Sequence, residues 1–394
     1  MDSRLHRDTF LMANDKRLRV GILFGGRSGE HEVSLASAAS VIRALNPEKY
    51  EAVPIGIAKD GRWLVGDSSN RLLPEVLKSG ERVVLPGDPT AGSLLSLGSS
   101  GGQSGSRAGG RLRLDVVFPV LHGTFGEDGT IQGLLELADI PYVGAGVLAS
   151  AVGMDKDVQK RLFRDAGLPI VPFHAFPRTQ WQAEREDVSA LLRQRFKFPL
   201  FVKPANLGSS VGMTRVAKAA ELGAAIDTAA EYAQKILVER GVKAREIEVS
   251  VLGNDEPMAS IPGEIVPHRK FYDYTAKYLE QGTRLSIPAK LTKQQAGKFQ
   301  ALAIRAYRAI ECEGMARADF FLEKRTGKIY VNELNTIPGF TAISMYPKLW
   351  EASGIPYSDL LDLLIGFALK RQAEKARTKF TIELPQGSGG ALET

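Results

Sequence analysis

The chain has 394 residues, of which 44% are hydrophobic, and its formal net charge is +6. A chain of this length and composition buries a large core in two or three domains, which excludes a disordered or fibrous protein. The segment 1–17 is charged and no run of about 18 apolar residues occurs, so we expect a cytoplasmic protein with no membrane partner. The sequence contains no basic-aromatic stripe, and we therefore expect no nucleic-acid partner despite the positive charge.

The first third of the chain predicts an open α/β sheet. Residues 19–45 read as a buried strand, RVGILF, followed by a glycine-rich turn and a helix, and residues 50–58 and 114–121 predict further strands. Ligands of such sheets bind at the carboxyl ends of the strands. Residues 87–110 contain GSLLSLGSSGGQSGSRAGG, and this glycine and serine content predicts a flexible surface insertion without a packed element.

Two further regions follow. A helix over 155–166 and a strand-loop-strand unit over 200–216 predict a small central domain. Strands after residue 246 alternate with helices over 293–309 and 357–370, and the chain becomes polar after Gln372. We expect an N-terminal domain over 18–150, a central domain over 151–240, a C-terminal domain over 241–372 and a tail over 373–394.

A predicted hairpin, MARADFFLEKRTGKIYVNELN, carries the clearest chemical pattern in the sequence. Arg317 and Asp319 lie two residues apart on its first strand, and Glu333 and Asn335 on its second, so each pair shares a face. Carboxylate and amide oxygens suit a hard cation such as Mg²⁺. A merely polar strand face is the alternative, but the neighbouring arginine and the NTIPGF turn that follows favour a metal-phosphate site.

A second group of residues indicates a polyphosphate. Lys203 precedes the small-residue loop 205–213, ANLGSSVGM, whose amides and hydroxyls suit phosphate oxygens, although a hairpin turn also explains such a loop. The loop has neither P-loop nor dinucleotide-fold spacing. Lys156, at a predicted helix start, supplies a second cation. Glu239-Arg240, at a predicted strand end, supplies an acidic group able to contact an adenine amino group. Ordinary solvated charges are the alternative for these three residues.

The motifs in this order resemble those of the ATP-grasp D-alanine–D-alanine ligases, from about residue 19 to residue 370. The only departures are the leader before residue 19, the Gly/Ser insertion, the tail, and Arg240, where many members carry lysine. The resemblance implies an ATP-grasp fold with an N-terminal open α/β (Rossmann-like) domain, a small central α+β domain and a C-terminal α+β domain. The matching motifs are GGRSGEHEVSL at 25–35, LHG and GEDG within 121–129, MDK at 154–156, VKP and GSSVG within 202–212, FYDY and AKY within 271–278, and NELNTIPG at 332–339.

The resemblance also implies an activity: ATP-dependent ligation of two D-alanines through a D-alanyl phosphate, with release of ADP and phosphate, for peptidoglycan precursors and so for cell-wall biogenesis and cell shape. It implies two Mg²⁺ ions, with Mn²⁺ as a substitute, small-molecule substrates only, and a homodimer. The alternative within the fold is a D-alanyl-D-lactate or other D-alanyl ligase. A regulatory protein without turnover is disfavoured because the residues that turnover requires are all present: Lys203, Arg317, Asp319, Glu333 and Asn335.

The residue roles that the resemblance implies fall into four groups. The catalytic group comprises Glu30, His122, Ser209, Tyr278, Arg317 and Gly339. The ATP-binding group comprises Lys156, Lys203, Ser210, Glu239, Arg240, Val242, Glu246 and Lys277. The metal ligands are Asp319, Glu333 and Asn335, and the second D-alanine is held by Lys277, Ser344 and Met345.

Within the catalytic group, Glu30 is expected to pair with the ammonium of the first D-alanine, and His122 to lie near its carboxylate. Arg317 and the amide of Gly339 are expected to stabilise the tetrahedral oxyanion. The polar, aromatic segment 272–282 is expected to close over the filled site as a lid and to exclude water.

Overall fold

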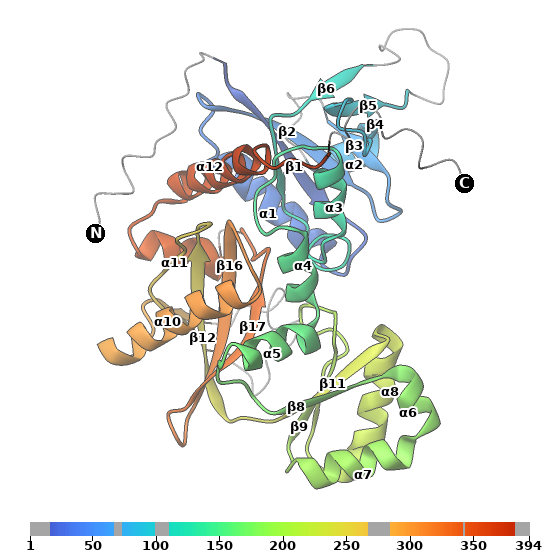
Figure 1. Ribbon diagram of the computed structural model, residues 1–394, viewed down its shortest axis with the longest axis vertical. Helices are drawn as coiled ribbons and strands as arrows, with labels where there is room; N and C mark the ends of the chain where they lie inside the picture. The colour runs from blue at the N-terminus through green and yellow to red at the C-terminus, as the bar shows by residue number, and fades with distance from the viewer. Residues whose placement is uncertain (1–15, 67–72, 99–109, 267–283, 342, 383–394) are drawn as a thin grey trace.

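The computed structural model describes residues 16–66, 73–98, 110–266, 284–341 and 343–382. Three sheets, each with its own helices, form a mixed α/β protein (Figure 1). The N-terminal sheet lies at the top of this view, the C-terminal sheet at lower left and the central sheet at lower right, with α4 and α5 between them. Within the described ranges no single helix is long and apolar enough to cross a membrane, although the bent pair α11 and α12 meets that criterion jointly by length and composition.

The elements have the following bounds. The helices are α1 His31–Ala44, α2 Leu73–Ser79, α3 Thr130–Leu137, α4 Val147–Met154, α5 Lys156–Asp165, α6 Arg178–Ala183, α7 Arg185–Arg195, α8 Leu222–Tyr232, α10 Lys293–Ala309, α11 Met345–Ala352 and α12 Tyr357–Lys375, with a 3₁₀ turn at Ala219–Glu221. The strands are β1 Leu18–Gly25, β2 Tyr50–Ile57, β3 Trp63–Val65, β4 Glu81–Val84, β5 Ser93–Ser96, β6 Arg111–Arg113, β7 Val116–Pro119, β8 Phe173–Pro177, β9 Leu200–Pro204, β10 Thr214–Val216, β11 Lys235–Arg240, β12 Ala244–Leu252, β13 Met258–Ala259, β14 Gly263–Val266, β15 Arg284–Ser286, β16 Met315–Glu323 and β17 Ile329–Asn335.

The N-terminal sheet has the strand order β6-β5-β4-β3-β2-β1-β7, with β1 parallel to both β2 and β7. The predicted strand-turn-helix start is confirmed by β1 and α1, because the apolar residues of β1 are buried and Gly25 adopts φ +90° at the turn. The chain leaves β1 toward β2 and later returns to its other side as β7. A crevice therefore opens at the carboxyl ends of β1 and β7.

The expectation that residues 87–110 contain no packed element was wrong for part of that range. Ser93–Ser96 forms β5, which pairs with β4 and β6, and Leu94 is 1% exposed in the N-terminal core. Two adjacent leucines sufficed for a strand because a preformed sheet edge supplies the hydrogen bonds. Residues 99–109 of the insertion lie outside the described residues.

We expect Leu94→Ala to lower the free energy of unfolding by about 2 kcal/mol, because it leaves a cavity in the N-terminal core. Urea unfolding of the variant measures the loss. Leu97→Ala is the matched control, since Leu97 is 56% exposed just beyond β5 and its truncation removes little buried area. Equal midpoints for the two variants would contradict the packing of β5 against the core.

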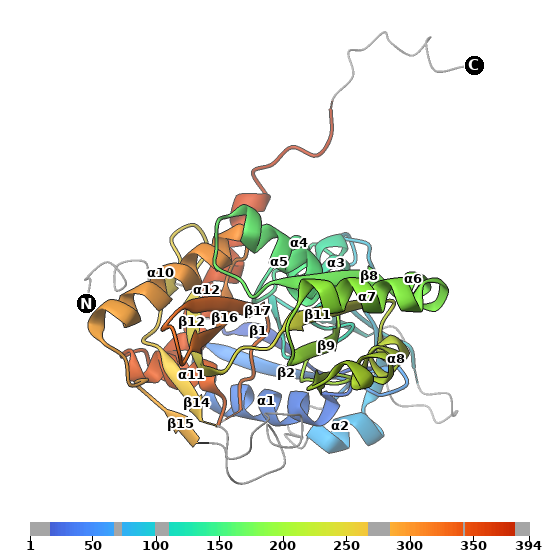
Figure 2. The ribbon, with the colours of Figure 1, turned by 90° about the horizontal axis from the view of Figure 1, so that it is seen from below.

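The central sheet is antiparallel, with strand order β10-β9-β11-β8. Val202 and Val238 point into a core shared with α6, α7 and α8. Side chains alternate along a strand, so Lys203 and Glu239 point to the opposite face, where Lys160 of α5 lies 3.2 Å from Glu239. Figure 2 shows the ribbon of α5 near β8 and β11. The predicted strand-loop-strand unit is thus confirmed by β9 and β10.

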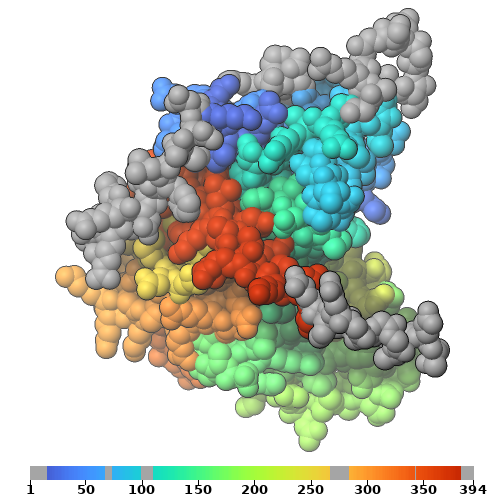
Figure 3. Space-filling view, turned by 45° about the horizontal axis from the view of Figure 1, so that its top comes forward, coloured from blue at the N-terminus to red at the C-terminus, as the bar shows by residue number. Residues whose placement is uncertain are grey.

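The C-terminal sheet runs β15-β14-β12-β16-β17, and α10 covers one face through the edge-on rings of Phe299 and Phe320. The predicted hairpin is confirmed by β16 and β17. Helix α12 continues to Lys375, past the expected end at residue 370, because its last turns bind the N-terminal domain. Arg371 donates to the carbonyl of Tyr142 at 2.7 Å, and Lys375 pairs with Glu136 at 2.6 Å. Figure 3 shows this red helix lying between the blue-cyan and orange parts of the surface.

Candidate active site

The hairpin β16-β17 brings its polar residues onto one face of the C-terminal sheet. Arg317 lies opposite Asn335 and Asp319 opposite Glu333. Arg317 donates to both oxygens of Asp319 at 2.7 Å, and Asn335 Nδ2 donates to Asp319 Oδ2 at 3.0 Å. Glu248, directly opposite Asp319 on β12, lies 3.1 Å from Arg317 Nε and was not predicted from the sequence. The arginine is therefore fixed between two carboxylates.

Helix α5 and the loop after β9 approach this face. Lys156 Nζ donates to the carbonyl of Leu207 at 2.7 Å and lies 3.6 Å from Glu333 Oε2. Ser209 and Ser210 adopt φ +49° and +59° in succession, a left-handed conformation uncommon for residues other than glycine. Lys156 therefore links the backbone of this loop, at Leu207, to Glu333 of β17.

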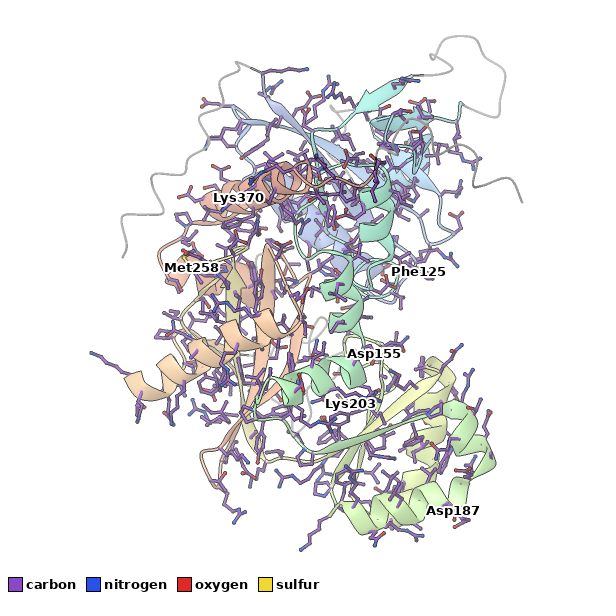
Figure 4. All side chains as sticks on the ribbon, in the orientation of Figure 1. Phe125, Asp155, Asp187, Lys203, Met258 and Lys370 are labelled. Atoms are coloured by element: carbon purple, nitrogen blue, oxygen red, sulfur yellow. The ribbon has the colours of Figure 1, made fainter. Side chains whose placement is uncertain are left out.

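A buried charge cluster lies between α5 and the central sheet. Glu239 forms ion pairs with Lys203 and Lys160, and Lys160 Nζ lies 3.2 Å from Glu239 Oε2. Burial alone raises the pKa of Glu239, but Lys160 and Lys203 together lower that pKa to about 2, so the carboxylate is ionised. Lys160 was not among the predicted site residues. Figure 4 labels Lys203 on the central sheet and Asp155, the residue that caps α5.

The remaining predicted nucleotide contacts lie around the β11-β12 connection. Arg240 ends β11, Val242 follows in the connection, and Glu246 lies within β12, paired with Phe321 in the sheet register. Arg240 Nη2 donates to the hydroxyl of Tyr330 at 3.1 Å, so its guanidinium is held against β17.

A carboxylate from the N-terminal domain meets the same loop. Ser209 Oγ donates to Glu30 Oε1, so two of the predicted catalytic residues are in contact. A Cβ atom on Gly123 or on Gly208 would lie 3.2 or 3.1 Å from Glu30 Oε2, so both loops approach this carboxylate closely, and Gly123 also adopts φ +80°, which favours glycine. Tyr278, another of the predicted catalytic residues, lies outside the described residues.

His122 is buried beside Glu30 at the carboxyl end of β7. Its Nδ1 lies 3.2 Å from the carbonyl of Ile337 and 3.6 Å from Glu127, and its Nε2 lies 3.1 Å from Ser37 Oγ. Burial lowers the pKa of His122, but Glu127 and Glu30 outweigh burial and raise the pKa overall. The imidazole is therefore biased toward the cation. Glu127 and Ser37 were not predicted, although the GEDG motif contains Glu127.

The turn after β17 places the remaining predicted residues. Ser344 Oγ accepts from the amide of Thr341 at 3.0 Å, and a Cβ atom on Gly339 would lie 2.8 Å from that oxygen, so a larger residue there would displace the Ser344 hydroxyl. Met345 begins α11 and packs its side chain with Ile265. Lys277 and the expected lid over 272–282 lie outside the described residues.

The donor set of the hairpin fits a hard cation. In the parts of the chain that the structure describes, no group of three or more His, Cys, Asp or Glu side chains is placed to hold a metal ion. Two carboxylates, Asp319 and Glu333, and the amide of Asn335 nonetheless lie on neighbouring strand positions. Such a sparse oxygen set matches Mg²⁺, which keeps positions for water and substrate phosphates.

Two sheets that hold lysines and carboxylates face each other across α5, beside an open α/β domain, and this arrangement defines the class of ATP-grasp ligases. The chain belongs to the D-alanine–D-alanine ligase family. The family described as D-ala D-ala ligase N-terminus matches residues 19–145, and the family described as D-ala D-ala ligase C-terminus matches residues 162–366.

Relatives span the chain almost completely. It is 49% identical to the D-alanine--D-alanine ligase of Heliobacterium modesticaldum, over 93% of this chain and 98% of the relative. It is 50% identical to that of Solibacter usitatus, over 92% and 99%. Among solved structures, the D-alanine-D-alanine ligase from Coxiella burnetii superposes with a TM-score of 0.80 at 39% identity, covering 91% of this chain and 96% of that one. The VanG D-Ala:D-Ser ligase from Enterococcus faecalis gives 0.78 at 36%, covering 90% and 100%.

Proposed function

We infer that this chain joins two D-alanine molecules into D-alanyl-D-alanine at the expense of ATP, for peptidoglycan precursor synthesis. The observation that carries this function is the meeting of Glu30 with Ser209: a carboxylate of the N-terminal domain is bonded to the phosphate loop of the central domain. An amino acid and a nucleotide thus share one site, in a chain related to D-alanine ligases along most of its length.

In the first step, a carboxylate oxygen of the first D-alanine attacks the γ-phosphorus of ATP, and ADP leaves. Glu30 would hold the substrate ammonium, and the His122 imidazolium would attract its carboxylate. Lys156, Lys203 and Ser210 would bind the phosphates, beside Glu239, Arg240, Val242 and Glu246 for the adenine and ribose. The product of this step is D-alanyl phosphate.

In the second step, the amine of the second D-alanine adds to the acyl carbon and phosphate leaves. Arg317 and the amide of Gly339 would stabilise the oxyanion, because donors fixed before charge develops need no reorganisation. Ser344, Met345 and Lys277 would contact the second amino acid, and Tyr278 would fasten the lid. Water must be excluded at this stage because it also attacks an acyl phosphate.

We also propose that Asp319, Glu333 and Asn335 hold two Mg²⁺ ions, for which Mn²⁺ can substitute. When bound, the ions neutralise charge on the transferred phosphoryl group. We further propose domain limits at residues 18–150, 151–240 and 241–372, a cytoplasmic location and a homodimeric assembly.

The purified protein is expected to release ADP and phosphate in equal amounts from ATP and D-alanine, and to form D-alanyl-D-alanine. Coupled ADP release and product mass measure this, with D-serine, D-lactate and L-alanine offered as competing second substrates. AMP and pyrophosphate as products, or an ester or D-alanyl-D-serine as the main product, would contradict the assignment. The control without amino acid reports ATP hydrolysis alone.

A further inference from the structure

Helix α5 is bonded to both sheets that face the proposed nucleotide site. Toward the C-terminal sheet, the side-chain amide of Gln159 donates to the carbonyl of Leu334 at 3.0 Å and accepts from its amide at 3.1 Å. Toward the central sheet, Lys235 of β11 pairs with Asp155 and Asp157 at 2.7 and 3.2 Å. The helix therefore sets the relation between the two sheets.

Lys160 joins both sheets through a single buried ammonium. Its side chain is 1% exposed, donates to the carbonyl of Asn332 on β17 at 3.1 Å, and lies 3.2 Å from Glu239 Oε2 on β11. Asn332 directly precedes Glu333, and Glu239 pairs with Lys203. This one group thus fixes the spacing between the hairpin and the nucleotide-facing side of the central sheet.

The cluster around Glu239 holds two lysines beside one carboxylate; burial lowers the pKa of Lys160, and Glu239 and Glu333 oppose that effect. Lys160 and Lys203 contribute two positive charges and Glu239 one negative charge, and the three side chains are 1%, 10% and 3% exposed. An unpaired charge in a buried position is unfavourable, so the second lysine is suited to an incoming anion. Lys203 is more exposed than Lys160, so Lys203 is the lysine that can reach the phosphates of a bound nucleotide.

We propose that Lys160 is a positioning residue for the nucleotide: it remains the counter-ion of Glu239 when Lys203 engages the phosphates of ATP. Without Lys160, Lys203 would be the partner of both Glu239 and the phosphates, and each contact would weaken the other. The carbonyl of Asn332 keeps the ammonium in place throughout. This role rests on the proposed function, because it assigns the phosphate ligand to Lys203.

The test compares Lys160→Met with Glu239→Gln and with the double variant. Lys160→Met is expected to raise the KM for ATP and the Kd of ADP by at least about tenfold, with the KM for D-alanine changed less than about twofold. When Glu239→Gln is already present, Lys160→Met should change the logarithm of the Kd of ADP by less than half as much as in the wild type. The reason is that the carboxylate charge balanced by Lys160 is then absent. ADP binding by calorimetry needs no ligation, so failure of the proposed function leaves this readout intact.

Lys235→Met is the matched control, because it removes a lysine link between the same helix and the same sheet without touching Glu239. It should lower the melting temperature and leave the Kd of ADP unchanged. Lys160→Gln, which keeps a donor for the Asn332 carbonyl, is the second variant if the methionine fails to fold, and it should weaken ADP binding likewise. Three results for Lys160→Met would each overturn the proposal: an unchanged Kd of ADP, an equal loss of ADP affinity with and without Glu239→Gln, or equal increases in the KM for ATP and the KM for D-alanine.

Discussion

Glu333→Gln and Asp319→Asn are each expected to reduce turnover by about a hundredfold or more while the fold stays intact. Each change keeps the shape of the side chain and removes one negative charge from the oxygen set on the β16-β17 hairpin. Fewer anionic ligands mean weaker binding of the proposed Mg²⁺ ions, and so less neutralisation of the phosphoryl group in transfer. The two residues are paired across the hairpin, so we expect the losses to be less than additive.

The measurement is initial rate against Mg²⁺ concentration, with circular dichroism and thermal unfolding to verify the fold. Glu323→Gln is the matched control, because Glu323 ends the same strand and its side chain accepts a hydrogen bond from Thr326 in the adjoining turn. This variant should retain the wild-type rate. A site variant that keeps more than about a tenth of the wild-type rate, a loss below ~1.4 kcal/mol, would show that the ions bind elsewhere.

The parts of the fold that local pattern determines could be predicted from the sequence. Alternating apolar residues on either side of a charged, glycine-containing turn specify the β16-β17 hairpin, since both strands and their connection are contiguous. The same holds for β1 and α1. The site residues on these elements were predictable because the side-chain period of a strand decides which of them share a face.

What could not be predicted depends on pairing between distant segments. Glu248 reaches Arg317 only because β12 lies beside β16 in one particular register, and no local signal specifies that register. Glu127 gains its role from the proximity of His122. In the sequence, Lys160 resembles an ordinary solvated charge in a polar helical segment. In the structure it is buried, because it contacts Glu239 of β11 and the carbonyl of Asn332 of β17. The last turns of α12 are likewise stabilised by the distant Glu136.

Composition misled the prediction in one place. A segment rich in glycine and serine has little intrinsic preference for a strand, yet Leu94 and Leu95 fill a position at an existing sheet edge. Tertiary pairing therefore outweighed local propensity at β5. The loop with Ser209 and Ser210 differs, because its small residues predict a phosphate loop from the sequence while its left-handed backbone appears only in three dimensions.

The last prediction concerns the arginine at the centre of the hairpin. Arg317→Lys is expected to lower kcat by about 10²–10³ with little change in the KM for ATP. Lysine keeps the positive charge but loses the planar fork that donates to both oxygens of Asp319 at 2.7 Å. Its ammonium would therefore no longer be held where the oxyanion forms, while ground-state nucleotide binding would be retained.

Arg245→Lys is the matched control for this change. Arg245 makes an equivalent fork with Glu264, at 2.8 and 2.6 Å, between neighbouring strands of the same sheet. Its loss should cost stability without affecting kcat. Rapid-quench measurement of the first turnover then separates the two steps: Arg317→Lys should still form ADP, with slow appearance of the dipeptide, because the proposed role of the arginine follows the phosphoryl transfer. An equal slowing of both steps would place Arg317 in phosphoryl transfer instead, and equal rates for Arg317→Lys and Arg245→Lys would remove it from catalysis.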